Sequence, residues 1–358
     1  MSRPAILIAG DCLEATDILA SIAKDVTVHT LPDGATRASF FKDCETKYVD
    51  VQAIYRTNTS AAKIGIFDAE LIKHLPPSVR CIAHVGAGYD QVDVHAAKAR
   101  NITVTHTPGA VDDATATTGM YLILSAFRLF SAAETNARKG KQCYSAVGRV
   151  RADVVKGDFK RGLVKGHDPE DKVLGIIGMG GVGQAVARRA LGFRMKIHYH
   201  NRRPVTFSEK EAVPCTYHAA MEDLLAVSDV VLLAVPLNQQ THHLLDAKAF
   251  SQMKKGAILV NVARGQVLDE SALLAALDKG HLSAAGLDVY PDEPNIHPRL
   301  REMSNVALLP HVGTFTHETE YAHEKLALEN VLLALQGKAL KTMVPEHRSE
   351  ASSCARVL

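Results

Sequence analysis

The stretch KVLGIIGMGGVG, residues 172–183, decides how the second half of this chain folds. An apolar run at 173–177 leads directly into a glycine-rich turn, and a helical pattern follows at 184–191; the turn reads Gly178, Met179, Gly180, Gly181, Val182, Gly183. Gly178 permits a tight turn, Gly180 lets backbone N–H groups approach a pyrophosphate, and Gly183 lets the helix pack closely on the strand. The order of strand, glycine turn and helix therefore predicts nucleotide binding by these six residues, with a plain glycine turn as the alternative.

The composition narrows the class of protein. The chain has 358 residues, 47% of them hydrophobic, which favours two domains with substantial cores. A net charge of +2 gives no reason to expect binding to nucleic acid or to a membrane. The six cysteines are scattered without CxxC spacing, which is typical of reduced thiols. No apolar run is long enough for a signal peptide or a membrane span, so we expect a cytoplasmic enzyme.

Alternating strand and helix patterns run through most of the chain. Short β-rich runs in the first hundred residues are expected at 5–9, 26–29, 53–55, 81–85 and 102–105. Further strands are expected after residue 172, at 195–199, 230–235, 258–262, 284–287 and 306–308. Alternation of this kind predicts an α/β fold with two doubly wound parallel sheets.

Longer helices and two polar segments complete the organisation. A nearly all-apolar helix is expected at 115–137 and an amphipathic helix at 316–336. Residues 139–167 form a basic segment, interpreted as a solvated surface segment, with a phosphate or partner contact as the alternative. Residues 341–358 are expected to form a polar tail, disordered towards its end.

The residues after the second strand of the glycine-turn unit indicate which cofactor binds. An acidic residue usually ends that strand in NAD-binding folds and bonds the ribose hydroxyls. His200 takes this position here and is followed by Asn201, Arg202 and Arg203. Because a guanidinium can bind a 2′-phosphate that a carboxylate would repel, we predict that NADP(H) is preferred. If the two arginines are ordinary loop charges, NAD(H) would be accepted as well.

Three later stretches carry residues suited to carbonyl reduction. They read NVARG at 261–265, GLDVYPDEP at 286–294 and PHVGT at 310–314, and each follows an expected strand, where open α/β sheets bind ligands. Arg264 can clamp a 2-oxo carboxylate with two hydrogen bonds. His311 can donate a proton near neutral pH, and Glu293 beside it would favour the protonated imidazole. We therefore predict Arg264, Glu293 and His311 as the catalytic set, although each alone has an ordinary structural interpretation.

These motifs, with HVGAGYD at 84–90, closely resemble the D-2-hydroxyacid dehydrogenase family over nearly the whole chain. Within it, residues 114–129 and the end of the last helix are most similar to the D-mandelate dehydrogenases. The resemblance implies a Rossmann cofactor domain at 110–315, inserted into a flavodoxin-like substrate domain formed by 1–109 and 316–340. It places the active site between the two domains and implies a homodimer formed through the cofactor domain.

The resemblance also implies roles for single residues. His311 would be the acid–base, Glu293 its support and Arg264 the carboxylate clamp. Backbone amides of the substrate loop would hold the carboxylate, from Gly86, Ala87 and Gly88. Further positions would contact the cofactor, together with Arg264 and His311: Thr115, Val235, Pro236, Thr241, Val262, Ala263, Asp288 and Gly313.

The resemblance to the mandelate branch favours a bulky 2-oxo acid such as benzoylformate, with glyoxylate or hydroxypyruvate as the alternative. A non-catalytic NAD(H)-sensing scaffold of the corepressor kind shares this fold and is the alternative from another class. A metal site is not expected, because the six-residue spacing of His311, His317 and His323 does not place them on one helical face.

Overall fold

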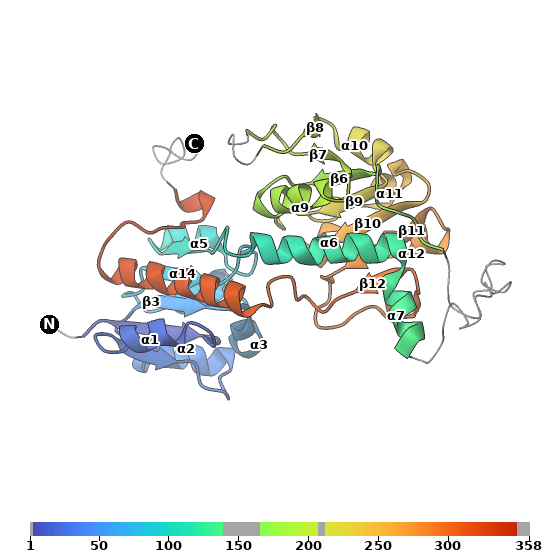
Figure 1. Ribbon diagram of the computed structural model, residues 1–358. Coiled ribbons are helices and arrows are strands. Elements are labelled where there is room, and N and C mark those ends of the chain that lie inside the picture. Colours follow the sequence, from blue (N-terminus) through green and yellow to red (C-terminus); the bar gives the residue numbers. More distant parts are fainter. Residues whose placement is uncertain (1–2, 139–164, 207–211, 349–358) are drawn as a thin grey trace. The chain divides into compact units, whose positions relative to one another are not determined.

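Two parallel β-sheets with flanking helices form the protein, as a computed structural model shows (Figure 1). The structure describes residues 3–138, 165–206 and 212–348. Packing divides the chain into unit 1, made of Met1–Val111 and Thr314–Leu358, and unit 2, made of Asp112–Gly313. The α/β class with two doubly wound sheets, predicted from the alternating pattern, is confirmed.

Unit 1 has a five-stranded parallel sheet in the order β2-β1-β3-β4-β5, which is the flavodoxin-like order. Its strands are β1 (Ala5–Ala9), β2 (Thr27–Thr30), β3 (Val51–Arg56), β4 (Cys81–His84) and β5 (Thr103–Thr105). Its helices are α1 (Thr16–Ile22), α2 (Arg37–Thr46), α3 (Ala61–Ile64), α4 (Ala69–His74), α5 (Val94–Ala99) and α14 (His317–Leu335), with short 3₁₀ turns η1 (Asn58–Ser60) and η4 (Pro345–His347).

Both faces of this sheet are buried, as the continuous apolar sequence of β1 requires. On one face α14 packs against β3 and β4, and its Leu328 and Val331 are fully buried. Apolar side chains of α2, α4 and α5, including Phe40 and Leu71, fill the other face. The sheet therefore holds the carboxyl ends of its strands in fixed positions.

Unit 2 has a seven-stranded parallel sheet in the order β12-β11-β10-β9-β6-β7-β8. Its strands are β6 (Val173–Ile177), β7 (Lys196–His200), β8 (Cys215–His218), β9 (Val230–Leu233), β10 (Ala257–Asn261), β11 (Leu282–Leu287) and β12 (Val306–Leu308). Its helices are α6 (Asp112–Arg128), α7 (Phe130–Arg138), α9 (Gly181–Leu191), α10 (Met221–Val227), α11 (Ala247–Gln252), α12 (Glu270–Asp278) and α13 (Pro298–Glu302), with a 3₁₀ turn η3 (Gly265–Val267). The strand order changes direction between β6 and β9, and ligands bind at such a point in open α/β sheets.

The long helix expected at 115–137 is in fact two helices. Leu129 has a φ of 51°, in the left-handed region that an α-helix of L-residues cannot continue through, and it separates α6 from α7. α6 packs against α9 and against β10 and β11 of its own unit, which accounts for its apolar sequence. The edge strand β8 was not predicted, because its sequence CTYH lacks the apolar run of the inner strands.

Residues 341–348 do not form the expected tail but pack on unit 1. Val344 is fully buried and its amide donates to Val104 O, while Met343 pairs with Thr105. The Val104 amide donates in turn to Nδ1 of His347 (3.0 Å). Burial of Val344 and these bonds explain why a polar-looking segment is ordered. Residues 349–358, and the basic segment at 139–164, lie outside the described residues.

Candidate active site and cofactor pocket

The glycine turn joins β6 to α9 with each glycine in a distinct environment. Gly178 has a φ of 101°, and a Cβ there would lie 2.5 Å from the Ala234 carbonyl oxygen. Gly183 faces the Gly178 carbonyl oxygen so closely that a Cβ would collide with it. A Cβ at Gly180 would meet nothing within 4 Å, so this position is open. The turn is thus open at Gly180, whereas the Asp112 carboxylate lies against Gly181, the first residue of α9.

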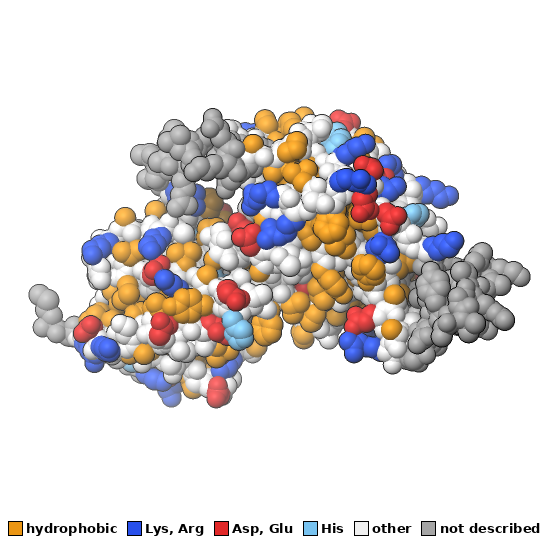
Figure 2. All heavy atoms as spheres, in the orientation of Figure 1, with side chains coloured by type: hydrophobic (Ala, Val, Ile, Leu, Met, Phe, Trp, Pro, Cys, Tyr) orange, Lys and Arg blue, Asp and Glu red, His pale blue; other side chains and the backbone are white. Residues whose placement is uncertain are grey.

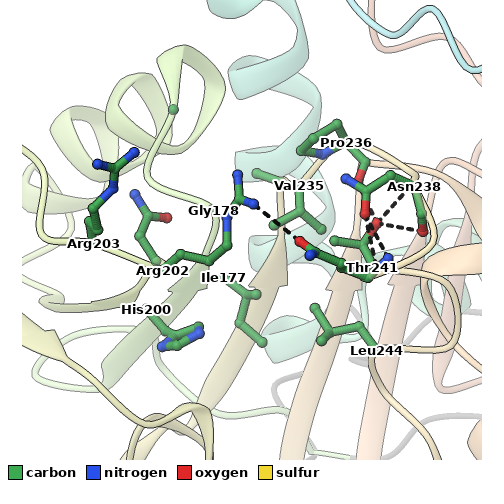
Figure 3. Close-up of a pocket in the computed structure, with 14 residues that line it drawn as sticks. Ile177, Gly178, His200, Arg202, Arg203, Val235, Pro236, Asn238, Thr241 and Leu244 are labelled. Carbon is green, nitrogen blue, oxygen red and sulfur yellow. Dashed lines mark hydrogen bonds between the residues drawn. The ribbon is translucent and has the colours of Figure 1, made fainter. Parts of the chain in front are cut away.

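A pocket of about 630 Å³ opens beside this turn (Figure 3). Many residues predicted to bind the cofactor line it: Gly178, Gly180, His200, Asn201, Arg202, Arg203, Val235, Pro236 and Thr241. Other residues that line the pocket were not predicted: Ile177, Ala234, Asn238, Gln240 and Leu244. For Asn238 and Gln240 the signal in the sequence was the polar run after β9, which reads NQQT at 238–241.

Figure 3 shows the β7 end, with His200, Arg202 and Arg203, across the pocket from the loop after β9. Nη1 of Arg202 donates to Oε1 of Gln240 (3.1 Å), which joins the two sides. Nδ1 of His200 donates to the carbonyl oxygen of His218 (3.0 Å), which fixes its ring. Among the described residues that line the pocket there is no carboxylate. Two guanidinium groups without a carboxylate fit a phosphate better than they fit ribose hydroxyls.

The remaining residues of the predicted cofactor set lie outside this pocket. Met179 is buried, and its amide donates to Oδ1 of Asn201 (2.8 Å). Gly181 and Val182 open α9. The others belong to α6 or follow strands β10, β11 and β12: Thr115, Val262, Ala263, Asp288, His311 and Gly313. These strand ends belong to the same sheet as the pocket.

Arg264, Glu293 and His311 follow three adjacent strands of this sheet. Arg264 comes after β10, Glu293 after β11 and His311 after β12, and the three strands are neighbours in the order β12-β11-β10. Because the strands are parallel, their carboxyl ends lie at one edge of the sheet. Residues separated by 47 positions in sequence are thereby gathered where α/β sheets bind ligands.

Glu293 and His311 are in direct contact. Oε2 of Glu293 lies 2.8 Å from Nδ1 of His311, and the two side chains are 36% and 39% exposed. The other oxygen, Oε1, accepts the amide of Tyr290 (3.0 Å). Burial would raise the pKa of Glu293, but the hydrogen bonds from His311 and Tyr290 and the charge of Arg264 outweigh it and lower the pKa. Glu293 is therefore anionic near neutral pH and accepts a hydrogen bond from Nδ1–H of His311, which leaves Nε2 for chemistry.

The buried carboxylate of Asp288 holds the loop that carries His311. Its two oxygens accept the amides of Val312 (2.8 Å) and Gly313 (2.9 Å). Burial raises the pKa of Asp288, against the lowering effect of these amides and of His311. His311 itself has a φ of 57°, a left-handed conformation that these bonds support. Sequence analysis expected Asp288 as a cofactor contact and did not predict this bond to the loop.

Two short contacts position Arg264. The side chain of Asn261 donates to the Arg264 carbonyl oxygen (2.9 Å), and Nη1 of Arg264 donates to Ala263 O (2.9 Å). A Cβ on Gly265 would collide with the Tyr290 backbone, so glycine is required for the ends of β10 and β11 to approach each other. This approach brings the charge of Arg264 near Glu293.

The substrate loop, Gly86–Gly88, belongs to unit 1 and follows β4. Its glycine at 86 has a φ of 150°, and its amide donates to Oγ1 of Thr107 (2.9 Å). Across the described ranges, no cluster of three or more His, Cys, Asp or Glu side chains could hold a metal ion, and none of the helices there is long and apolar enough to cross a membrane.

Comparison with known proteins identifies the family. Residues 121–313 match the model of the NAD binding domain of D-isomer specific 2-hydroxyacid dehydrogenases. The chain belongs to the D-isomer specific 2-hydroxyacid dehydrogenase family. It is therefore an oxidoreductase acting on the CH–OH group with a nicotinamide cofactor, as predicted, and its substrates are small 2-oxo or 2-hydroxy acids.

Individual relatives of the family cover almost the whole chain. The 4-methyl-2-oxopentanoate reductase A of Aspergillus oryzae is 41% identical over 97% of this chain and 99% of its own. A glyoxylate reductase structure from Paecilomyes thermophila superposes with a TM-score of 0.87, at 40% identity, covering 97% of this chain and 100% of that one. Rhodotorula graminis D-mandelate dehydrogenase superposes with a TM-score of 0.86, at 34% identity, covering 96% and 98%.

A fourth relative was solved with a cofactor. The NADPH-dependent glyoxylate/hydroxypyruvate reductase of Sinorhizobium meliloti, in complex with NADP and malonate, has a TM-score of 0.80 at 29% identity, covering 97% of this chain and all of that one. The family prediction is confirmed, and a mandelate dehydrogenase is among the structural neighbours. The benzoylformate preference is not confirmed, since similar relatives also carry the names of other reductases.

Proposed function

We propose that this protein reduces a 2-oxo acid to the corresponding D-2-hydroxy acid, with Arg264, Glu293 and His311 as its catalytic residues. The observation that carries the proposal is the 2.8 Å contact between Glu293 and His311, beside Arg264 at three neighbouring strand ends. In this proposal unit 2 is the cofactor domain, and unit 1 is the substrate domain through the loop at Gly86–Gly88.

Each residue of the proposed site has a separate role. When bound, the nicotinamide cofactor supplies the hydride. Arg264 binds the substrate carboxylate and holds the neighbouring carbonyl in place. His311 donates its Nε2 proton to the oxygen as the carbonyl is reduced. Glu293 accepts a hydrogen bond from Nδ1–H of His311, which orients the ring. Asp288 holds the backbone behind the ring so that Nε2 is presented in one direction.

We propose that NADP(H) is the preferred cofactor and that NAD(H) is used less well. The support is a pocket lined by Arg202 and Arg203 without a carboxylate, beside a glycine turn open at Gly180. The NADP complex of the related Sinorhizobium meliloti reductase supports the same preference. His200 takes the position where a ribose-binding acid would stand, and its ring is fixed by His218.

Names of relatives point to substrates of different size, so the test is a set of acids. Initial rates should be measured with glyoxylate, hydroxypyruvate, 4-methyl-2-oxopentanoate and benzoylformate, each with NADPH and with NADH. Turnover of at least one acid, faster with NADPH, is the expected result. The acid with the largest kcat/KM identifies the side-chain class, and benzoylformate is the acid expected from the resemblance to mandelate dehydrogenases.

We further propose a homodimer formed through unit 2. Tyr121 on α6 and Phe130 on α7 expose large aromatic surfaces, 43% and 46% respectively, that a partner subunit would cover. Sedimentation equilibrium gives the mass directly, and a monomer at micromolar concentration would contradict this part of the proposal.

A non-catalytic NAD(H)-sensing scaffold is the alternative function. It shares the fold and the Arg264, Glu293 and His311 set, so residues alone do not distinguish it. Steady turnover of any 2-oxo acid that is abolished in the His311→Ala variant excludes the scaffold as the sole function. Tight NADPH binding without turnover of any acid would instead favour it.

A further inference from the structure

Two buried histidine side chains and one backbone amide hold the substrate loop by its carbonyl oxygens. The Gly86 oxygen accepts the amide of Thr107 (2.9 Å), the Ala87 oxygen accepts Nδ1 of His106 (2.8 Å), and the Gly88 oxygen accepts Nε2 of His84 (2.9 Å). All three carbonyls are thereby directed into unit 1. A carbonyl oxygen repels a carboxylate. Because these three carbonyl oxygens point away from the outer side of the loop, the amides are left to meet an anion there.

The amides of this loop are not equivalent. That of Gly86 already donates to Oγ1 of Thr107 (2.9 Å). Those of Ala87 and Gly88 have no acceptor among the residues that the structure describes. The expectation that all three amides hold a carboxylate stays a prediction, and the Gly86 amide would have to leave Thr107 to do so. Two adjacent amides remain, enough for one carboxylate.

The geometry determines which nitrogen of His84 carries its proton. Nδ1 of His84 lies 3.0 Å from Nη1 of Arg56, and a guanidinium is always a donor and never an acceptor. Nδ1 must therefore accept, so the ring is neutral and its hydrogen is on Nε2. That hydrogen is the one donated to the Gly88 oxygen. Arg56 thus sets the tautomer that the loop needs.

The position of Arg56 at the end of β3 allows it to contact His84. The parallel pairing of β3 with β4 places Arg56 beside His84 at the carboxyl ends of both strands, and both side chains are 0% exposed. The guanidinium also donates to Oδ1 of Asn58 (3.0 Å) and to Oε1 of Gln91, beyond the far end of the loop. Burial lowers the pKa of Arg56 to about 10, with Asp90 acting against this, so it stays charged at neutral pH.

We infer that Arg56 and His84 are positioning residues for the substrate carboxylate, holding the Gly88 carbonyl and with it the end of the loop whose Ala87 and Gly88 amides meet that carboxylate. The inference rests on the proposed function, since it takes the 2-oxo acid as the ligand of this loop. The sheet does not need these bonds for its register, because backbone pairing already joins β3 to β4.

The test compares three variants. His84→Leu removes the donor to Gly88 and the acceptor for Arg56, whereas His84→Gln supplies an amide that can replace both. Ile54→Ala is the matched control, because Ile54 is a fully buried residue of the same strand, two positions from Arg56, and contacts only the apolar core. The cavity that Ile54→Ala leaves should destabilise unit 1 without changing the contacts of the loop. Binding of oxamate, a carboxylate analogue of the substrate, is measured by calorimetry, with KM and kcat for the best 2-oxo acid and Kd for NADPH.

His84→Leu should weaken oxamate binding by about tenfold and raise KM by about tenfold, because about one hydrogen bond is lost. Kd for NADPH should stay within about twofold of wild type. His84→Gln should restore both to within about threefold of wild type. An equal rise in KM in His84→Leu and Ile54→Ala would show a merely structural role and overturn the inference, as would unchanged oxamate binding in His84→Leu. If wild-type protein binds oxamate but reduces no 2-oxo acid, the proposed function fails while the binding comparison still decides the role of His84.

Discussion

Replacing Glu293 with glutamine tests the partnership with His311 most sharply. Glutamine keeps the shape of the side chain but has one oxygen where glutamate has two. If that oxygen keeps the Tyr290 amide (3.0 Å in the native structure), an NH₂ group faces Nδ1 of His311. Nδ1 must then accept a hydrogen bond, and the neutral ring with hydrogen on Nε2 is a poor acid. Glu293→Gln should therefore lower kcat without preventing substrate binding.

The size of the effect follows from the exposure of the pair. A hydrogen bond to a charged group contributes about 1.5–3 kcal/mol and a neutral one about 0.5–1.5 kcal/mol. Because both side chains are more than a third exposed, solvent screening favours the lower end, a difference of about 1–1.5 kcal/mol. This corresponds to a fall in kcat of about 5- to 10-fold.

The assay is spectrophotometric oxidation of NADPH across a range of pH. The comparison is made on kcat at each pH, which the loss of the carboxylate partner should lower. Asp292→Asn is the matched control, since it removes the same charge one residue away from a side chain that bonds Asn295 rather than His311. A Glu293→Gln variant whose kcat and pH profile equal those of Asp292→Asn would refute the reasoning.

Three further outcomes are expected. Arg202→Ala combined with Arg203→Ala should raise KM for NADPH by at least about tenfold and spare NADH, since each phosphate contact contributes about 1.5–3 kcal/mol; an equal loss with both cofactors would show that the arginines are structural. Gly183→Ala should destabilise unit 2 by about 1–3 kcal/mol through overpacking, and an unchanged thermal midpoint would contradict the close helix–strand contact. Burial would raise the pKa of Asp229, but its bonds to Lys254 and the Val173 amide lower it below 3.8. Asp229→Asn should therefore destabilise the protein at pH 7, with the difference from wild type shrinking as pH falls from the unfolded-state value through the folded pKa; a difference that grows in acid would contradict this.

Local patterns were enough to predict the parts of the site that lie in continuous sequence. The glycine turn at 178–183 and the basic residues after β7 line or adjoin one pocket because strand, turn and helix are consecutive. Arg264, Glu293 and His311 could be grouped in advance because each follows an apolar run, and parallel strands end at one edge.

Contacts that depend on side-chain bonds between distant segments could not be predicted. The bond from Arg56 to His84 arises from the pairing register of β3 with β4, and nothing in either segment alone indicates it. Asp288 bonds a loop 24 positions away, which depends on where β12 lies beside β11. The break of the long helix at Leu129 was missed because neither glycine nor proline marks it in the sequence FRLFSAA at 127–133.

The central claim is that His311 is the proton donor, and kcat of the His311→Asn variant tests it most directly. Asparagine tolerates the left-handed φ of 57° found at this position, so the loop held by Asp288 should keep its shape. Reduction of the best 2-oxo acid should fall by about 10²- to 10⁴-fold in kcat, the usual effect of losing a general acid, while Kd for NADPH stays unchanged. A fall of less than about threefold would contradict the account, because such a loss is far below what general acid catalysis contributes.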